Sequence, residues 1–196
     1  VTGTYKTDIL VQTADYRNYE GVYGSHYLGI NKIGDLVVRV AGSPAQFARI
    51  EQLVVRAGLG AALQLTRGGS HAALAACDVT LIASGTATLE AALFKRPMVI
   101  AYHMNWLSWK LHQRKMLQPW VGLPNILAGE FLVPELLQQA ATPAALARET
   151  LAWLIDDAAT EARRSALRQR FVSLHRELSR DTVRLASDAI EQVLAA

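Results

Sequence analysis

The residues of this chain best suited to chemistry lie in one short segment, Ser84-Gly85-Thr86-Ala87-Thr88-Leu89-Glu90. Its turn places a hydroxyl on either side of a glycine, which takes backbone angles that other residues avoid. If a helix begins there, its first N–H groups lack intrahelical partners and carry partial positive charge, which suits a phosphate. Glu90 follows about one helical turn later, where a carboxylate can reach a sugar hydroxyl. Taken alone, the turn is better explained as an ordinary helix start capped by Thr86, with Glu90 solvated.

A strand and a helix must hold this segment in place. Val79–Ala83 is a short run with little charge, which is typical of a strand covered on both faces. Helix Thr86–Phe94 follows, and Met98–Ala101 is the next strand. Strands that alternate with helices at this spacing indicate βαβ units and a parallel sheet. Ligands bind such sheets beyond the carboxyl ends of the strands, so we expect Ser84 and Tyr102 to lie on one rim.

The other expected elements extend this α/β pattern on both sides. Residues 1–40 are rich in tyrosine and glycine and favour short strands, whereas Leu123-Pro124-Asn125 favours a rigid turn. We divide the chain into a β segment at 1–40, a Rossmann-like domain at 41–156 and a helical tail at 157–196. The further expected strands are Asp8–Thr13, Leu36–Val40 and Leu63–Thr66, and the further expected helices are Pro44–Ala57, His71–Ala76, Asn105–Met116, Val133–Gln139, Pro143–Ile155 and most of Ala158–Leu194.

Two helical segments leave alternatives open. Asn105–Met116 is expected to be amphipathic and combines tryptophans with basic residues, which suits a membrane interface and equally suits packing with a solvated basic face. The arginines of Ala158–Leu194 suit nucleic acid, but a solvated face paired with Glu161, Glu177 and Asp181 explains them better. We therefore expect no nucleic-acid partner.

Composition bounds the class of protein. The hydrophobic fraction of 51% and the charged fraction of 19% are typical of a well-buried globule, and the net charge of +3 is compatible with phosphorylated ligands. The single cysteine, Cys77, precludes an intrachain disulfide and is expected to be a small core residue. The histidines show no metal-ligand spacing, and no Asp-x-Asp motif is present, so we expect neither metal nor cofactor. A nicotinamide enzyme is disfavoured because no G-x-G-x-x-G follows an expected strand.

Further sequence blocks accompany the Ser84 segment in a specific order. They are Lys95-Arg96-Pro97-Met98-Val99, Tyr102, Val121-Gly122-Leu123-Pro124-Asn125-Ile126-Leu127-Ala128-Gly129 and Val133-Pro134-Glu135-Leu136-Leu137-Gln138. In this order and spacing the chain resembles the lipid-A-disaccharide synthases, a family of bacterial glycosyltransferases. The resemblance is clear between Ala73 and Gln138 and looser up to Ala196. It covers the C-terminal, donor-binding half of a two-domain (GT-B) enzyme.

The resemblance implies a reaction. UDP-2,3-diacylglucosamine and 2,3-diacylglucosamine 1-phosphate (lipid X) would give lipid A disaccharide 1-phosphate and UDP. It implies a cytoplasmic enzyme that contacts the inner membrane peripherally, and it places the catalytic base and the acceptor site in the other half. A homodimer or a partner chain that supplies that half is left open. The alternative is a non-catalytic UDP-binding or interaction module.

Residue by residue, the resemblance also implies a binding site. The residues expected to line the diphosphate and ribose are Ser84, Gly85, Thr86, Thr88 and Glu90. Those expected on the side of the donor sugar are Tyr102, Asn125, Glu135 and Gln138. No residue of this chain is assigned as the catalytic base.

Overall fold

The computed structural model describes residues 27–30, 36–40, 44–61, 63–67, 70–83, 85–115 and 118–194. The predicted strand Asp8–Thr13 and Ser84 lie outside these residues, and the predicted domain boundaries stay predictions. In chain order the described elements are β1 (Tyr27–Ile30), β2 (Leu36–Val40), α2 (Pro44–Arg56), β3 (Leu63–Arg67), α3 (Ser70–Ala76), β4 (Val79–Ala83), α4 (Thr86–Leu93), β5 (Met98–Tyr102), α5 (Trp106–Lys115), α6 (Leu123–Ala128), β6 (Glu135–Leu137), η2 (Gln138–Ala140), α7 (Pro143–Leu151), α8 (Ala158–Leu178) and α9 (Thr182–Leu194).

The strands form one six-stranded sheet in the order β3-β2-β1-β4-β5-β6. β2 runs parallel to β3, and β4, β5 and β6 run parallel to one another. β1 alone among the described strands is antiparallel to both of its neighbours. The predicted α/β class, with a Rossmann-like sheet, flanking helices and a helical tail, is confirmed, with β1 as the one departure from a parallel sheet.

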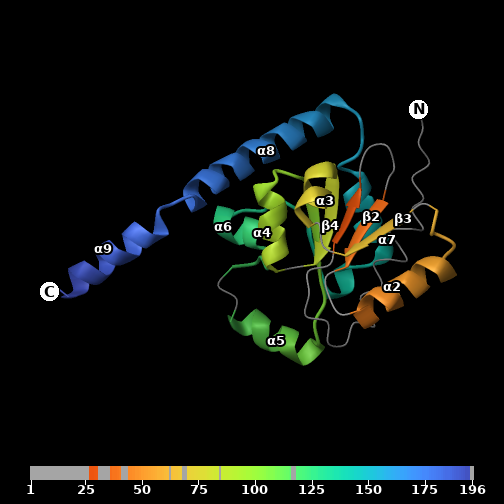
Figure 1. Cartoon of the computed structure of the whole chain (residues 1–196), viewed down its shortest axis with the longest axis horizontal. Coiled ribbons are helices and arrows are strands. Elements are labelled where there is room, and N and C mark those ends of the chain that lie inside the picture. The colour runs from red at the N-terminus through yellow and green to blue at the C-terminus, as the bar shows by residue number, and fades with distance from the viewer. Residues whose placement is uncertain are drawn as a thin grey trace.

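Helices cover both faces of the sheet. Figure 1 shows α3, α4 and α6 on one side and α2 and α7 on the other, with α8 lying across the outer side of α4. The central strands β4 and β5 are buried along almost their whole length, as their uncharged sequences predict. Ala87, Ala91 and Ala92 of α4 are buried against them, and these small side chains allow the helix to approach closely.

The predicted helix Val133–Gln139 is wrong. Glu135–Leu137 is instead the strand β6, which pairs with β5 so that Ile100 lies opposite Glu135 and Tyr102 opposite Leu137. A proline disfavours helical backbone angles in the residue before it, which is Val133 here. Pairing with the exposed edge of β5 therefore overrides the helical propensity of glutamate and leucine.

The predicted turn Leu123-Pro124-Asn125 is also wrong, because these residues begin α6. Gly122 is the N-cap, and proline is tolerated in a first helical turn since its missing N–H would have no intrahelical partner there. Gly129 ends the helix in a left-handed conformation with φ 68°. Leu123-Pro124-Asn125 therefore forms the first turn of a helix.

Two predicted helices are shorter or interrupted. α7 ends at Leu151, whereas Ile155 was expected. The tail is helical as predicted but is divided into α8 and α9 by a break between Leu178 and Thr182. α8 buries Leu167, Phe171 and Leu174, whereas α9 buries no residue, and Figure 1 shows it extending away from the sheet.

Candidate functional site

The carboxyl ends of three neighbouring strands meet at one rim of the sheet. Ala83 at the end of β4 lies opposite Ala101, and Tyr102 at the end of β5 lies opposite Leu137 at the end of β6. Tyr102 is the last residue of β5, and Gly85 and Gln138 come just after β4 and β6, so the three lie at the same edge of the sheet. This confirms the predicted rim for its described residues.

Gly85 gives this rim its distinctive backbone. It is the N-cap of α4, with φ 141° and ψ −168°, and no side chain caps the helix. That φ lies in the region that favours glycine, and a Cβ built at Gly85 would have no heavy atom within 4 Å. The predicted cap by Thr86 is wrong, since Thr86 is the first helical residue and is exposed. The start of α4 consequently faces open space.

Thr88 holds the turn from beneath. Its side chain is fully buried, its hydroxyl donates to the Gly85 carbonyl over 2.7 Å, and its backbone N–H donates to the same oxygen over 3.1 Å. A ligand at the surface does not reach such a hydroxyl without rearrangement of the helix. The geometry therefore gives Thr88 the task of positioning Gly85, and its predicted contact with a diphosphate stays a prediction.

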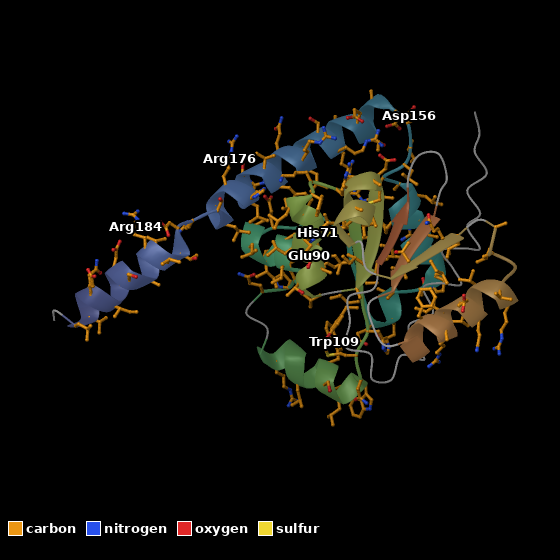
Figure 2. All side chains as sticks on the ribbon, in the orientation of Figure 1. His71, Glu90, Trp109, Asp156, Arg176 and Arg184 are labelled. Carbon is orange, nitrogen blue, oxygen red and sulfur yellow. The ribbon has the colours of Figure 1, made fainter. Side chains whose placement is uncertain are left out.

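Glu90 and Tyr102 remain available at the rim. The side chains of both are partly exposed. Figure 2 shows Glu90 on α4 and Trp109 on α5, the helix that follows β5. A carboxylate one turn into α4, beside an uncapped helix start, can accept hydrogen bonds from hydroxyls of a ligand whose anionic group lies at that start.

Asn125 and Glu135 form a hydrogen-bonded junction below the rim. Asn125 is fully buried, and its side-chain oxygen accepts from the N–H groups of Leu132 and Val133 at 2.9 and 3.0 Å. Its nitrogen donates to the Val133 carbonyl at 2.9 Å and to Glu135 Oε1 at 2.8 Å. These bonds satisfy both ends of the amide inside the protein. The predicted role of Asn125 toward the donor sugar stays a prediction.

The Glu135 carboxylate completes this junction with both of its oxygens. Oε1 accepts from the Gly122 N–H at 2.9 Å and Oε2 from the Val121 N–H at 2.8 Å. A side chain at Gly122 would meet Ile100 Cδ1 at 2.3 Å and Glu135 Oε1 at 2.9 Å. Sequence reasoning missed Gly122 as a structural requirement, although a glycine immediately before a helix-initiating Leu-Pro pair was the available signal.

Gln138 links β6 to the segment after β5. It is almost fully buried and has φ 53°. In the amide orientation that satisfies both of its atoms, the side-chain nitrogen donates to the Met104 carbonyl at 3.0 Å and the side-chain oxygen accepts from the Met104 N–H at 3.2 Å. Gln138 thus fixes the backbone just beyond Tyr102, and direct contact with a sugar stays a prediction.

Cys77 is a core residue, as predicted. It is buried, and its sulfur contacts the Leu74 carbonyl at 3.4 Å and Thr80 Oγ1 at 3.2 Å. Burial raises the pKa of the Cys77 thiol, which disfavours the nucleophilic thiolate. Chemistry at the rim therefore does not involve this sulfur.

Two properties of the described residues concern metal ions and membranes. Among the described residues, no three His, Cys, Asp or Glu side chains gather in a way that could hold a metal ion. In the same part of the chain, no helix is both long enough and apolar enough to cross a bilayer. On α8, Arg164 pairs with Glu161 at 2.8 Å, which is one of the predicted salt bridges.

Comparison with known proteins decides the family. Residues 31–190 match the family model described as lipid-A-disaccharide synthetase. The chain belongs to the lipid-A-disaccharide synthetase family. The match is wider than the sequence blocks that first indicated it, because it includes β2, α2 and most of α9.

Curated relatives of this family are named lipid-A-disaccharide synthase. The protein from Albidiferax ferrireducens is 62% identical over 155 residues, covering 79% of this chain and 40% of the relative. That from Verminephrobacter eiseniae is 58% identical over 153 residues, covering 75% and 38%. That from Pseudomonas syringae pv. tomato is 47% identical over 165 residues, covering 84% and 41%. The chain thus spans about 40% of the length of these synthetase-family relatives.

Proposed function

We propose that this chain is the donor-binding part of a glycosyltransferase that makes the lipid A disaccharide. The donor is UDP-2,3-diacylglucosamine and the acceptor is 2,3-diacylglucosamine 1-phosphate. The products are lipid A disaccharide 1-phosphate and UDP. Family membership supports the reaction class, and the uncapped start of α4 beside Gly85 is the structural observation that supports nucleotide binding.

The transfer requires stabilisation of charge on a leaving group. An acceptor hydroxyl oxygen attacks the anomeric carbon, the bond between that carbon and the diphosphate oxygen breaks, and UDP leaves with the electron pair. The proton of the hydroxyl passes to a general base that we assign to no residue of this chain. Negative charge grows on the diphosphate, where N–H groups at the start of α4 are suited to bind it.

The proposed roles of the described site residues follow from their exposure, and the role proposed for Ser84 follows from the sequence resemblance. Ser84, Gly85 and Thr86 line the diphosphate, and Glu90 accepts hydrogen bonds from the ribose. Tyr102 lies beside the donor. The buried residues Thr88, Asn125 and Gln138 and the partly exposed Glu135 act by positioning, a role favoured by their internal hydrogen bonds. The reaction proceeds without a metal ion.

The proposal includes a location and an assembly. The two substrates carry acyl chains, so the enzyme works in the cytoplasm at the surface of the inner membrane. The acceptor site and the general base belong to the remaining part of the family's length, in the same polypeptide, in a homodimer or in a partner chain. The coverage of about 40% of each relative supports this division of labour.

Calorimetric titration with UDP tests the donor site. Saturable binding is expected, and Glu90→Ala should weaken it at least about tenfold, the equivalent of about 1.4 kcal/mol. Glu191→Ala on the exposed face of α9 is the matched control and should bind UDP like the unmodified chain. A folded chain that does not bind UDP would falsify the proposed donor site.

A further inference from the structure

The helix α5 presents large apolar side chains to solvent beside the rim. Trp106, Leu107 and Leu111 are 64%, 55% and 52% exposed. Lys110 and Arg114 are exposed on the same helix. Figure 1 shows α5 set apart from the helices that cover the two faces of the sheet. Exposure of these apolar side chains to water costs free energy. Contacts among the described residues do not remove that cost.

Apolar and basic residues share one face of this helix. With 100° between successive residues, Trp106, Lys110, Arg114, Leu107 and Leu111 fall in that order around an arc of about 140°. The Lys110 ammonium lies 5.1 Å from the centre of the Trp106 ring, within cation–π range, so the charge and the indole ring are neighbours on this face. The exposed face of α5 therefore carries tryptophan, leucine and basic side chains together.

This combination matches the interface of an anionic bilayer. Indole rings favour the headgroup level, leucines favour the adjoining acyl region, and lysine and arginine bind lipid phosphates. The sequence of α5, WLSWKLHQRK, contains no acidic residue that would repel those phosphates. A protein partner would require a complementary acidic and apolar surface, whereas an anionic bilayer offers both chemistries everywhere.

The helix α5 lies close in the chain to the rim of the sheet, which relates a bilayer contact at α5 to ligand binding at the rim. Trp106 follows Tyr102 by four residues, so their Cα atoms are at most about 14 Å apart even with an extended chain. Gln138 holds the intervening backbone at Met104. A surface bound to α5 is thereby kept close to the carboxyl ends of β4, β5 and β6.

We propose that the exposed face of α5 docks this protein on an anionic lipid bilayer. Trp106, Leu107 and Leu111 enter the boundary between headgroups and acyl chains, and Lys110 and Arg114 bind lipid phosphates. The inference deepens the proposed function and rests on it for its purpose, since docking there brings a lipid-linked donor to the rim. The docking itself is measurable without any nucleotide.

Sedimentation with sucrose-loaded vesicles tests the inference on the whole chain. Vesicles of phosphatidylcholine with phosphatidylglycerol should bind the chain at least about tenfold more tightly than phosphatidylcholine alone. The triple variant Trp106→Ser, Leu107→Ser, Leu111→Ser should lose at least about tenfold in affinity. The double variant Lys110→Glu, Arg114→Glu should lose a similar factor and its preference for the anionic lipid.

Matched control variants separate α5 from other exposed surfaces. Val183→Ser, Leu185→Ser and Ile190→Ser on α9 remove side chains that are 77%, 45% and 60% exposed. Arg168→Glu with Arg176→Glu reverses two exposed charges on α8. Both controls should sediment like the unmodified chain, and circular dichroism should show unchanged helix content in every variant.

The outcomes are decisive in both directions. Equal binding to both vesicle types, no binding, or a loss confined to the α8 or α9 controls overturns the inference. UDP titration on the same samples keeps the two proposals apart. If the chain binds UDP but does not bind vesicles, only the docking role of α5 is overturned. If it binds vesicles but does not bind UDP, only the proposed donor site is overturned.

Discussion

The side-chain nitrogen of Asn125 donates to Glu135 Oε1 over 2.8 Å and thereby joins α6 to β6. The same two side chains hold the backbone N–H groups of Val121, Gly122 and Val133. The edge strand of the sheet and the preceding helix are thus one hydrogen-bonded unit. Residues first expected to face a sugar therefore have an architectural task.

Asn125→Ala should destabilise the fold by about 2–4 kcal/mol, because it leaves buried N–H and C=O groups without partners. Urea denaturation measures this change. Asn125→Asp should also destabilise the fold, since it loses both donated bonds and places a second carboxylate beside Glu135. Gln139→Ala, at an exposed amide nearby, should stay within about 0.5 kcal/mol of the unmodified chain. Comparable effects of Asn125→Ala and Gln139→Ala would contradict this account of the junction.

Gly85→Ala should strain the start of α4. The backbone φ of 141° is one that alanine adopts at a cost of about 1–3 kcal/mol, although space for its methyl group is open. We expect lower thermal stability and weaker UDP binding. Gly60→Ala, where a Cβ also has no heavy atom within 4 Å and φ is not in the glycine region, should change neither quantity. Equal tolerance of both substitutions would contradict the special conformation of Gly85.

The buried thiol of Cys77 should make stability fall in alkaline solution. Its pKa is raised by burial, so the folded chain holds the proton at pH values where the unfolded chain releases it. The free energy of unfolding is then unaffected below the unfolded pKa of about 8.5 and decreases as the pH rises above it. Comparison with Cys77→Ala across pH 7–10 by urea denaturation isolates this slope. Rapid alkylation of the native thiol at neutral pH would be the contrary result.

Asp157 should make the start of α8 sensitive to acid. Its carboxylate accepts from the Thr160 N–H at 2.6 Å, and this hydrogen bond lowers the pKa of Asp157. Its stabilising effect is complete above the unfolded pKa of about 3.9 and is lost as the pH falls through the folded pKa. Asp157→Ala should lower the melting temperature at neutral pH and converge with the unmodified chain in strong acid. Asp157→Asn, which keeps a capping oxygen, should show less of this pH dependence.

Local sequence was sufficient for the central elements of the fold. Val79–Ala83 was predicted with both of its ends correct, because an uncharged run between polar residues has few alternatives to a buried strand. The following helix began at Thr86 as expected. The shared rim followed from the carboxyl ends of parallel neighbours.

Long-range pairing limited the remaining predictions. The residues next to Glu135 in the sequence do not predict that it extends the sheet, because its pairing partner Ile100 lies far away along the chain. β1 is antiparallel for a similarly non-local reason, since it pairs with both β2 and β4. The internal hydrogen bonds of Asn125 and Gln138 depend on the same tertiary contacts. Their residue types alone indicated contacts with a ligand. The structure shows both side chains buried, with their hydrogen bonds made inside the protein.

The two hydrogen bonds from Thr88 to the Gly85 carbonyl have a thermodynamic consequence for any anion bound at the rim. They fix the turn before a ligand arrives, so little backbone freedom remains to be lost on association. The affinity for an anion should then be sensitive to small changes in the geometry of this turn. Thr88→Val should weaken binding through a less favourable binding entropy, while the ligand's own contacts remain. The shape of the turn at Gly85 is thus set from inside the protein before any ligand binds.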